Sequence, residues 1–449
     1  MAVPVISEIE NGRFWWVARL LQWCTTRHVL LVMTGLQLLW VWAIWWTGAT
    51  TAVSKIVVLT IYTLTAGLIS WLLPLPKNIA WLGWLEKHTW QLGTAVLVIT
   101  AVFGIYYATA QRVWTFDEEG SIQAAQLVAE EGVDNLFANY GKRPWLGRQH
   151  PPLMPIIYGG VMAIFGTNPL NARLTALAFA LGTQLLIFAI GRQLYGGHVG
   201  LVGMALFATF PLVVRLGTAA MVEMPLTFFF ALTLYFALLY LEQGRVGWLV
   251  GMALTAVIGL LSKYTMVFVF PAIFGWFVVY GRARQALTVS AILAALGGLV
   301  LLAWVLAARS LGALAGQLFT LKTYIFMLAT NPYGRQLFIE TFTTRLPSAF
   351  GLYNLFAVIV GGILLLAKRQ KQSWLLLIWI IAVWLPVSLT LPDHRYYLAS
   401  FPAVALAGAV AMWHFPANLP RLMLAVVLQA GGAFYLFVDW ARAAGLFVN

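Results

Sequence analysis

Apolar runs long enough to cross a lipid bilayer follow one another along most of the chain. A membrane helix needs about 20 residues to span the hydrocarbon core, so each run predicts one transmembrane helix. The predicted spans are residues 28–47, 52–73, 89–109, 171–190, 199–214, 218–241, 246–261, 265–280, 285–307, 348–367, 373–390, 396–413 and 419–440. The pattern therefore predicts an all-α polytopic membrane protein with about thirteen transmembrane helices.

Lys and Arg in the short loops predict the direction of these spans. With the N-terminus inside and each span crossing once, most of them fall on the cytoplasmic side, which is the usual bias. The exceptions on the outer side are Lys55, Arg215, Lys263, Arg395 and Arg442. This orientation requires that the apolar stretch 153–166 does not cross. It is short for a span and ends at the turn-like Gly166-Thr167-Asn168-Pro169, so we expect a juxtamembrane or re-entrant helix there.

Two long segments, 110–170 and 308–347, then lie outside. Both mix aromatic, apolar and charged residues, as amphipathic helices at a membrane interface do. No repeat or low-complexity linker divides the chain. We therefore expect one domain with three regions. They are an N-terminal part with an extra hairpin (1–88), a catalytic membrane module (89–413), and a last span with a short tail (414–449).

Composition supports a membrane environment. Hydrophobic residues make up 62% of the 449 positions and charged residues 9%, more apolar surface than a soluble domain could bury. The net charge of +13 indicates contact with anionic lipid headgroups and a phosphate-bearing substrate rather than nucleic acid. Residues 1–27 are polar and basic, so no cleavable signal is expected. Cys24 is the single cysteine, which excludes an internal disulfide.

Acidic residues concentrate in the first long loop. Three of them, Glu130, Glu131 and Asp134, are expected to face solvent. Asp117 and Glu118 instead follow directly on the end of a span. Partial desolvation at the membrane boundary would raise the pKa of a carboxyl group there and make it a better base.

Glu223 is the second acidic candidate, because it lies within an apolar run at the outer end of the span 218–241. An ionisable residue in such a place predicts function. The alternative is a helix-start carboxylate held by backbone amides, with Pro225 marking the first turn.

The basic residues at the outer ends of helices form a complementary set. A single outer Lys is usually an interfacial anchor, but Arg215, Lys263 and Arg395 together predict an anion site, such as one for phosphate. Arg148 and His150 precede Pro151-Pro152, which fixes the backbone.

The tyrosines Tyr396 and Tyr397 follow Asp393-His394-Arg395 and are either interfacial belt residues or the wall of a sugar or phosphate site. No pattern of a soluble nucleotide site stands out. The carboxylates could hold a divalent metal ion, although no ligand spacing specifies one.

Six short elements, in this order, resemble the C-type glycosyltransferases (GT-C) of the protein O-mannosyltransferase and aminoarabinose transferase superfamily. They span residues 89 to 413. The elements are Phe116-Asp117-Glu118, His150-Pro151-Pro152-Leu153, Asn171-Ala172-Arg173-Leu174, Arg215 with Glu223-Met224-Pro225-Leu226, Ser262-Lys263-Tyr264, and Arg395-Tyr396-Tyr397-Leu398 through Pro402.

The resemblance implies an inverting enzyme of low metal dependence that uses a polyprenyl-phosphate monosaccharide as donor. Asp117 would be the general base, and Glu118 and Glu223 would orient the acceptor or stabilise developing charge. The donor phosphate would be bound by His150, Arg215, Lys263 and Arg395, and the substrates would also contact Arg148, Tyr264, Tyr396 and Tyr397.

The resemblance leaves the sugar and the acceptor open. The acceptor could be a glycan, a lipid or a protein. Glu119-Gly120-Ser121 stand where aminoarabinose enzymes tend to have an Arg-Tyr pair, which weighs against an aminoarabinose donor or a lipid A acceptor. The expected location is the inner (plasma) membrane, with the active site on the extracytoplasmic face.

Two other functions compete with this one. In a transporter or flippase for a lipid-linked or anionic sugar, the same charges would line a path through the membrane. Against it, the unusual charges gather at one face, and no inverted repeat is evident. A non-catalytic scaffold would leave the positions of Asp117, Glu223 and Lys263 without a cause.

Overall fold

The computed structural model describes most of the chain between residues 53 and 413. The described residues are 31, 34–35, 38–39, 41–42, 53–72, 80–110, 114–142, 150–368 and 370–413.

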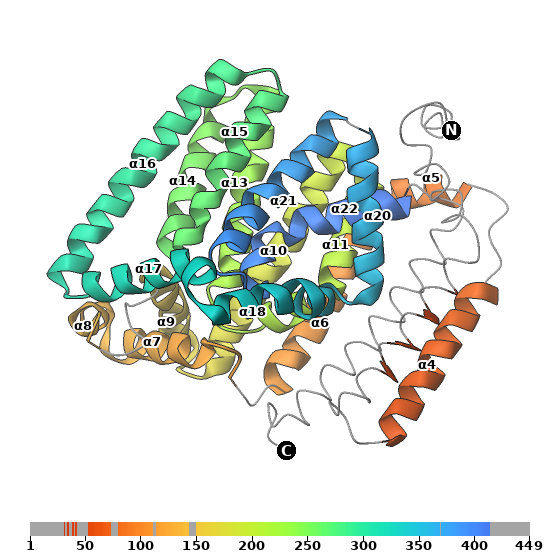
Figure 1. The fold of residues 1–449 in the computed structure, drawn as a ribbon, viewed down its shortest axis with the longest axis horizontal. Coiled ribbons are helices and arrows are strands. Elements are labelled where there is room, and N and C mark those ends of the chain that lie inside the picture. Colours follow the sequence, from red (N-terminus) through yellow and green to blue (C-terminus); the bar gives the residue numbers. More distant parts are fainter. Residues whose placement is uncertain are drawn as a thin grey trace.

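Helices and the turns between them account for these residues, and no strand occurs among them (Figure 1). In chain order they are α4 (Val53–Leu72), α5 (Ala80–Lys87), α6 (Thr89–Ala110), α7 (Glu118–Glu131), α8 (Val133–Asn139), α9 (Leu153–Phe165), α10 (Pro169–Tyr195), α11 (Gly197–Thr209), α12 (Pro211–Leu216), α13 (Glu223–Gln243), α14 (Val246–Ser262), η1 (Tyr264–Phe268), α15 (Val269–Val279), α16 (Ala283–Ser310), α17 (Leu314–Thr330), α18 (Pro332–Glu340), the π-helical turn η2 (Thr341–Arg345), α19 (Leu346–Phe350), α20 (Leu352–Lys368), α21 (Lys371–Leu389), η3 (His394–Ser400) and α22 (Phe401–Trp413).

The predicted all-α membrane fold is confirmed. Each expected span from 52–73 to 396–413 corresponds to a described helix. The span 28–47 is described only at scattered helical positions, and 419–440 lies outside the described residues. Six described segments are long and apolar enough to cross a membrane: Thr89–Ala110, Pro169–Tyr195, Glu223–Gln243, Ala283–Ser310, Lys371–Leu389 and His394–Trp413.

The predicted turn before α10 is present, and local chemistry explains it. The Asn168 side chain accepts a hydrogen bond from the Leu170 amide (2.9 Å), and Pro169 occupies the first helical position. Asn caps the free amides of a helix start, and proline there has no amide to satisfy. The preceding α9 has 13 residues, about 20 Å of helix, which is short for a span.

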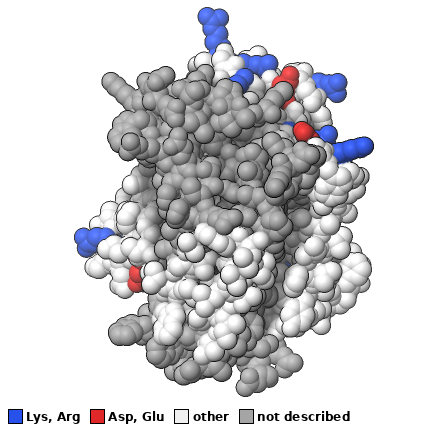
Figure 2. All heavy atoms as spheres, turned by 90° about the vertical axis from the view of Figure 1, so that its right-hand side faces the viewer, with Lys and Arg blue, Asp and Glu red and all other residues white. Residues whose placement is uncertain are grey.

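Short helices form a layer at one end of the bundle. Figure 1 shows α7, α8, α9, α17 and α18 at the lower end of the long helices. Several Lys and Arg side chains are visible at the upper end in Figure 2. Arg245 and Arg282 lie in the connections α13–α14 and α15–α16, and Arg284 and Lys371 lie in the first turns of α16 and α21. Exposed basic residues also occur at the lower end, among them Arg309, Lys322 and Arg335, so the predicted orientation stays a prediction.

Small residues allow neighbouring helices to approach closely. A Cβ at Gly361 in α20 would lie 2.1 Å from the carbonyl oxygen of Ala407 in α22, whereas one at Gly362 would meet nothing within 4 Å. Glycine at such a crossing lets backbones touch, as small residues do between membrane helices.

We expect Gly361→Ala to lower the free energy of unfolding by about 1–3 kcal/mol, because the added methyl group must push α20 and α22 apart. Gly362→Ala is the matched control and should be neutral or stabilising, since alanine favours a helix by about 1 kcal/mol over glycine. Thermal unfolding in detergent measures both. Equal effects of the two substitutions would contradict the close crossing.

Candidate active site

Charged side chains from separate elements meet at the end of the bundle where the short helices lie. Asp117 immediately precedes α7, and its Oδ2 lies 2.8 Å from Nη1 of Arg395 in η3. The Asp117 side chain is 53% exposed and that of Arg395 is 13% exposed. About half of the Asp117 side-chain surface is therefore covered by the protein. Its carboxylate is accessible, and its distinguishing feature is the neighbouring guanidinium.

A second ion pair lies deeper. Nζ of Lys263, between α14 and η1, is 2.9 Å from Oε1 of Glu223, the first residue of α13, and both side chains are buried. Burial lowers the pKa of the Lys263 ammonium group, and the Glu223 carboxylate opposes that shift. The other carboxylate oxygen, Oε2, is buried and has no hydrogen-bond partner among the described residues. The pair is thus tightly held and keeps one free acceptor.

Tyr396 connects the two ion pairs. Its ring lies under Nζ of Lys263, 4.3 Å from the centroid, and its hydroxyl accepts a hydrogen bond from Nη2 of Arg395 (3.1 Å). Tyr324 of α17 lies close enough to Arg395 and Tyr396 to interact with them electrostatically. No sequence signal marked Tyr324, since it is one of several aromatic residues on a largely exposed helix. Through it, the short-helix layer contacts the charged cluster.

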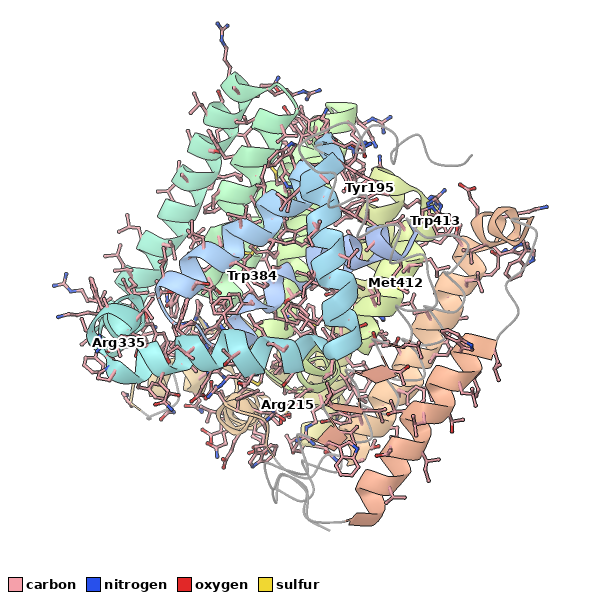
Figure 3. The ribbon with its side chains drawn as sticks, turned by 45° about the vertical axis from the view of Figure 1, so that its right-hand side comes forward. Tyr195, Arg215, Arg335, Trp384, Met412 and Trp413 are labelled. Atoms are coloured by element: carbon pink, nitrogen blue, oxygen red, sulfur yellow. The ribbon has the colours of Figure 1, made fainter. Side chains whose placement is uncertain are left out.

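Arg215 of α12 joins the cluster through an aromatic ring. Its Cζ lies 4.3 Å from the centroid of Phe116, and Cζ of Arg395 lies 5.1 Å from the same centroid. Figure 3 shows Arg215 at the end of the bundle beside the short helices. The three basic residues predicted to bind an anion therefore do converge, although they come from α12, the break after α14, and η3.

Glu118 has a different environment from Asp117. It is fully buried, with Oε1 accepting from Nε of Arg173 (2.8 Å) and the Ala220 amide (3.1 Å). Its Oε2 accepts from the Thr115 amide (2.9 Å) and from Nη2 of Arg173 (3.3 Å). One carboxylate thus joins the turn before α7, helix α10 and the segment before α13. This arrangement is a structural clasp, and it leaves no open face for an acceptor.

Breaking the clasp should be costly. Glu118→Gln leaves the buried Arg173 without its counter-charge, and loss of one partner of a buried pair costs about 3–5 kcal/mol. The double substitution Glu118→Gln with Arg173→Gln should cost less than the sum of the two single ones, because it leaves no uncompensated charge. Thermal unfolding of the three variants in detergent measures this coupling.

The exposed pair Glu340–Arg345, at 2.7 Å, is the matched control. Solvent screens such pairs, so Glu340→Gln should change stability little. Additive effects at Glu118 and Arg173 would show that the two side chains act separately.

The remaining predicted residues are distributed unevenly. His150 is close enough to Glu223 for their charges to interact, and its carbonyl oxygen accepts a hydrogen bond from the Tyr140 hydroxyl. The Tyr397 side chain is fully buried and its hydroxyl pairs with that of Ser388, while the Tyr264 hydroxyl bonds to Trp304 and Gln317. The described contacts of these two tyrosines do not reach the cluster, and Arg148 lies outside the described residues. The acids expected to face solvent do so: Glu130, Glu131 and Asp134.

Asp393 fixes the start of η3, which carries Arg395. Its Oδ1 accepts from the Arg395 amide (3.1 Å) and lies 3.0 Å from Nδ1 of His394. Burial would raise the pKa of Asp393, but the close contact with His394, the charge of Arg395 and the Arg395 amide outweigh it and lower the pKa from 3.8 to about 2.

This shift predicts a pH dependence. Because the pKa is lower in the folded state, ionised Asp393 stabilises the fold above pH 3.8, and this contribution disappears as the pH falls through about 2. Near pH 6 we expect Asp393→Asn, which keeps the capping oxygen, to cost about 2 kcal/mol. The difference between the two proteins in thermal unfolding should shrink between pH 4 and pH 2. The exposed Asp134→Asn is the control, and a difference that does not vary with pH would contradict the assignment.

Among the described residues, no group of three or more His, Cys, Asp and Glu side chains could hold a metal ion.

Comparisons with known proteins agree with the motifs. Residues 149–308 match the family model of the dolichyl-phosphate-mannose-protein mannosyltransferases. A polyprenol-phosphate-mannose–protein mannosyltransferase of Corynebacterium glutamicum is 28% identical over 124 residues, which are 27% of this chain and 24% of that protein.

Solved structures share the fold. ArnT from Cupriavidus metallidurans in the apo state matches 71% of this chain and 59% of its own at 14% identity, with a TM-score of 0.53. The archaeal oligosaccharyltransferase AglB from Archaeoglobus fulgidus, in complex with an inhibitory peptide and a dolichol-phosphate, matches 82% of this chain and 57% of its own at 15% identity, with a TM-score of 0.51.

These similarities confirm the predicted resemblance to GT-C enzymes of the protein mannosyltransferase and ArnT type. The chain spans about a quarter of the length of the mannosyltransferase relative and less than two thirds of the length of each structural neighbour.

Proposed function

We propose that this chain is a membrane glycosyltransferase that moves a monosaccharide from a polyprenyl-phosphate donor to an acceptor hydroxyl, with Asp117 as the general base. The observation that carries the proposal is the accessible Asp117 carboxylate, 2.8 Å from the Arg395 guanidinium, at the edge of a cluster of buried charges. In such a reaction the base and the phosphate-binding cations act on opposite sides of one anomeric carbon, so both must lie within the length of a single sugar and its two changing bonds.

The donor class follows from charge and from the relatives. Arg215, Lys263 and Arg395 lie around Phe116 and Tyr396 at one end of a bundle of apolar helices. ArnT has been solved with undecaprenyl phosphate and AglB with a dolichol-phosphate, so a lipid-linked phosphate suits both the charges and the membrane position. The lipid chain would lie against the apolar helices.

The proposed reaction is a single displacement. Asp117 takes the proton of the acceptor hydroxyl, and the acceptor oxygen attacks the anomeric carbon of the sugar. The bond from that carbon to the phosphate oxygen breaks, and its electron pair leaves with the polyprenyl phosphate, which becomes a dianion. The cations stabilise this developing charge. Attack opposite the leaving group inverts the anomeric configuration.

The other residues take roles that fit their contacts. Glu223 has a free Oε2 that can accept a hydrogen bond from a sugar or acceptor hydroxyl, while its Oε1 holds Lys263. His150 would add a donor near Glu223. Glu118 is reassigned from acceptor binding to the clasp that positions Asp117. We place the site on the extracytoplasmic face, because the short connections α13–α14 and α15–α16 at the opposite end carry Arg245 and Arg282, and positive short loops favour the cytoplasm.

The test is transfer by purified protein in lipid. The protein is offered a panel of radiolabelled polyprenyl-phosphate sugars with glycan, lipid and peptide acceptors, and release of polyprenyl phosphate is measured. Asp117→Asn should lower the rate by about 10²–10⁴-fold, the usual contribution of a general base, and keep donor binding. Asp134→Asn, an exposed acid of the same region, should transfer at the normal rate.

Three outcomes count against the proposal. Unchanged transfer by Asp117→Asn would remove its role as base. A product with the anomeric configuration of the donor would exclude single displacement. Vectorial movement of the lipid-linked sugar in sealed vesicles, without bond cleavage, would favour a transporter.

A further inference from the structure

Phe116 has an unusual backbone conformation. Its φ is +50°, and it is the one non-glycine residue with a positive φ among the described residues. A bulky side chain rarely adopts this left-handed region, and it persists only where the surroundings hold it. Here the clasp holds it: the Thr115 amide donates to Oε2 of Glu118, and the Glu118 amide donates to the Thr115 carbonyl (3.0 Å). The turn around Phe116 is therefore closed by two hydrogen bonds.

The strained turn places the Phe116 ring within reach of two guanidinium groups. Arg215 approaches from α12 at 4.3 Å and Arg395 from η3 at 5.1 Å, measured from Cζ to the ring centroid. The ring of His394 lies edge-on at 6.0 Å. Cations within about 6 Å of an aromatic ring are attracted to its face, so one ring binds both arginines. The Phe116 side chain is 39% exposed, which is unusual for a residue whose role is to fill a core.

Two like charges beside one another repel, and each lowers the tendency of the other to stay charged. An aromatic ring that both contact offsets part of that repulsion. In addition, Nε of Arg395 is buried and makes no hydrogen bond among the described residues. Arg395 thus keeps one N–H donor for an anion, and Arg215 brings a second positive charge to the same ring.

We propose that Phe116 is a positioning residue. Its ring holds the guanidinium groups of Arg215 and Arg395 together as a binding site for the phosphate of the lipid-linked donor. The identity of the ligand rests on the proposed function. Because Asp117 follows Phe116 directly, the same turn also sets the contact between the base and Arg395. One strained residue then fixes the spacing of base and phosphate site.

Three substitutions separate the ring from the backbone. Phe116→Tyr keeps the aromatic face, Phe116→Leu keeps apolar bulk without it, and Phe116→Gly permits the positive φ but has no ring. The probe is undecaprenyl phosphate, titrated into purified protein in detergent. We expect the affinity of Phe116→Tyr for undecaprenyl phosphate to stay within about twofold of that of the unmodified protein. Phe116→Leu and Phe116→Gly should bind it about tenfold more weakly, in line with the usual strength of cation–π contacts.

Steady-state transfer gives a second readout. In Phe116→Leu and Phe116→Gly, KM for the donor should rise more than kcat falls. In Phe116→Tyr, both constants should stay near those of the unmodified protein. Phe165→Leu, at a 72% exposed position of α9, is the matched control and should change neither. If Phe116→Leu is too unstable to purify, the comparison of Phe116→Tyr with Phe116→Gly still tests whether the aromatic ring is needed for binding.

The positioning role is overturned if Phe116→Leu and Phe116→Gly bind undecaprenyl phosphate as tightly as Phe116→Tyr does. It is also overturned if all three variants lose affinity equally, because that is the behaviour of a purely structural position. Failure of the proposed function would look different. The unmodified protein would transfer no donor sugar, although Phe116→Tyr would still bind undecaprenyl phosphate more tightly than Phe116→Leu and Phe116→Gly.

Discussion

A single buried carboxylate connects three separate segments at the end of the molecule where the charged cluster lies. Glu118 receives four hydrogen bonds, two from Arg173 and two from backbone amides. A carboxylate buried without partners would cost far more than a domain can tolerate, so the charge is compatible with burial only because all these donors converge on it. The donors come from three segments far apart in the sequence, and their convergence fixes where the turn before α7 lies relative to α10 and α13.

The rest of the cluster follows from that anchor. The turn held by Glu118 carries Phe116 and Asp117, which contact Arg215 and Arg395. Deeper in the bundle, Lys263 and Glu223 compensate one another, and Tyr396 bridges the two levels. Each charge therefore has an opposite charge or an aromatic ring beside it. This is how a protein with so few charged residues keeps several of them at the end of an apolar bundle.

Sequence predicted the large features because they depend on local physics. Apolar length marks helices such as α10 and α13, and Asn168-Pro169 marks a helix start wherever it occurs. Charges at helix ends identified Asp117, Glu223, Lys263 and Arg395, because a charge among apolar residues is costly at any position. The clasp role of Glu118 could not be predicted this way. Asp117 and Glu118 are adjacent acids, and only the packing of α10 and the Ala220 segment makes one buried and the other accessible.

Phe116 and Tyr324 escaped prediction for a related reason. Aromatic residues are common throughout the chain, and nothing in the pattern separates a ring that binds arginines from one that faces lipid. The positive φ of Phe116 depends on hydrogen bonds to a side chain two residues away, which no propensity encodes. The orientation in the membrane stays a prediction, which rests on loop cations counted directly from the sequence.

The contact between Asp117 and Arg395 also has a thermodynamic consequence. In the proposed site, the Arg395 guanidinium would be shared by the Asp117 carboxylate and the donor phosphate. One positive charge cannot neutralise both anions fully, so each anion would weaken the interaction of the other with Arg395. Linkage is reciprocal: if the phosphate weakens the pairing of Asp117 with Arg395, then neutralising Asp117 strengthens the phosphate's hold by the same factor. Proton uptake by Asp117 during the reaction would therefore tighten the grip on the departing lipid phosphate. In the proposed reaction, return of that proton to water would loosen the contact again, and deprotonation and product release would be coupled through one arginine.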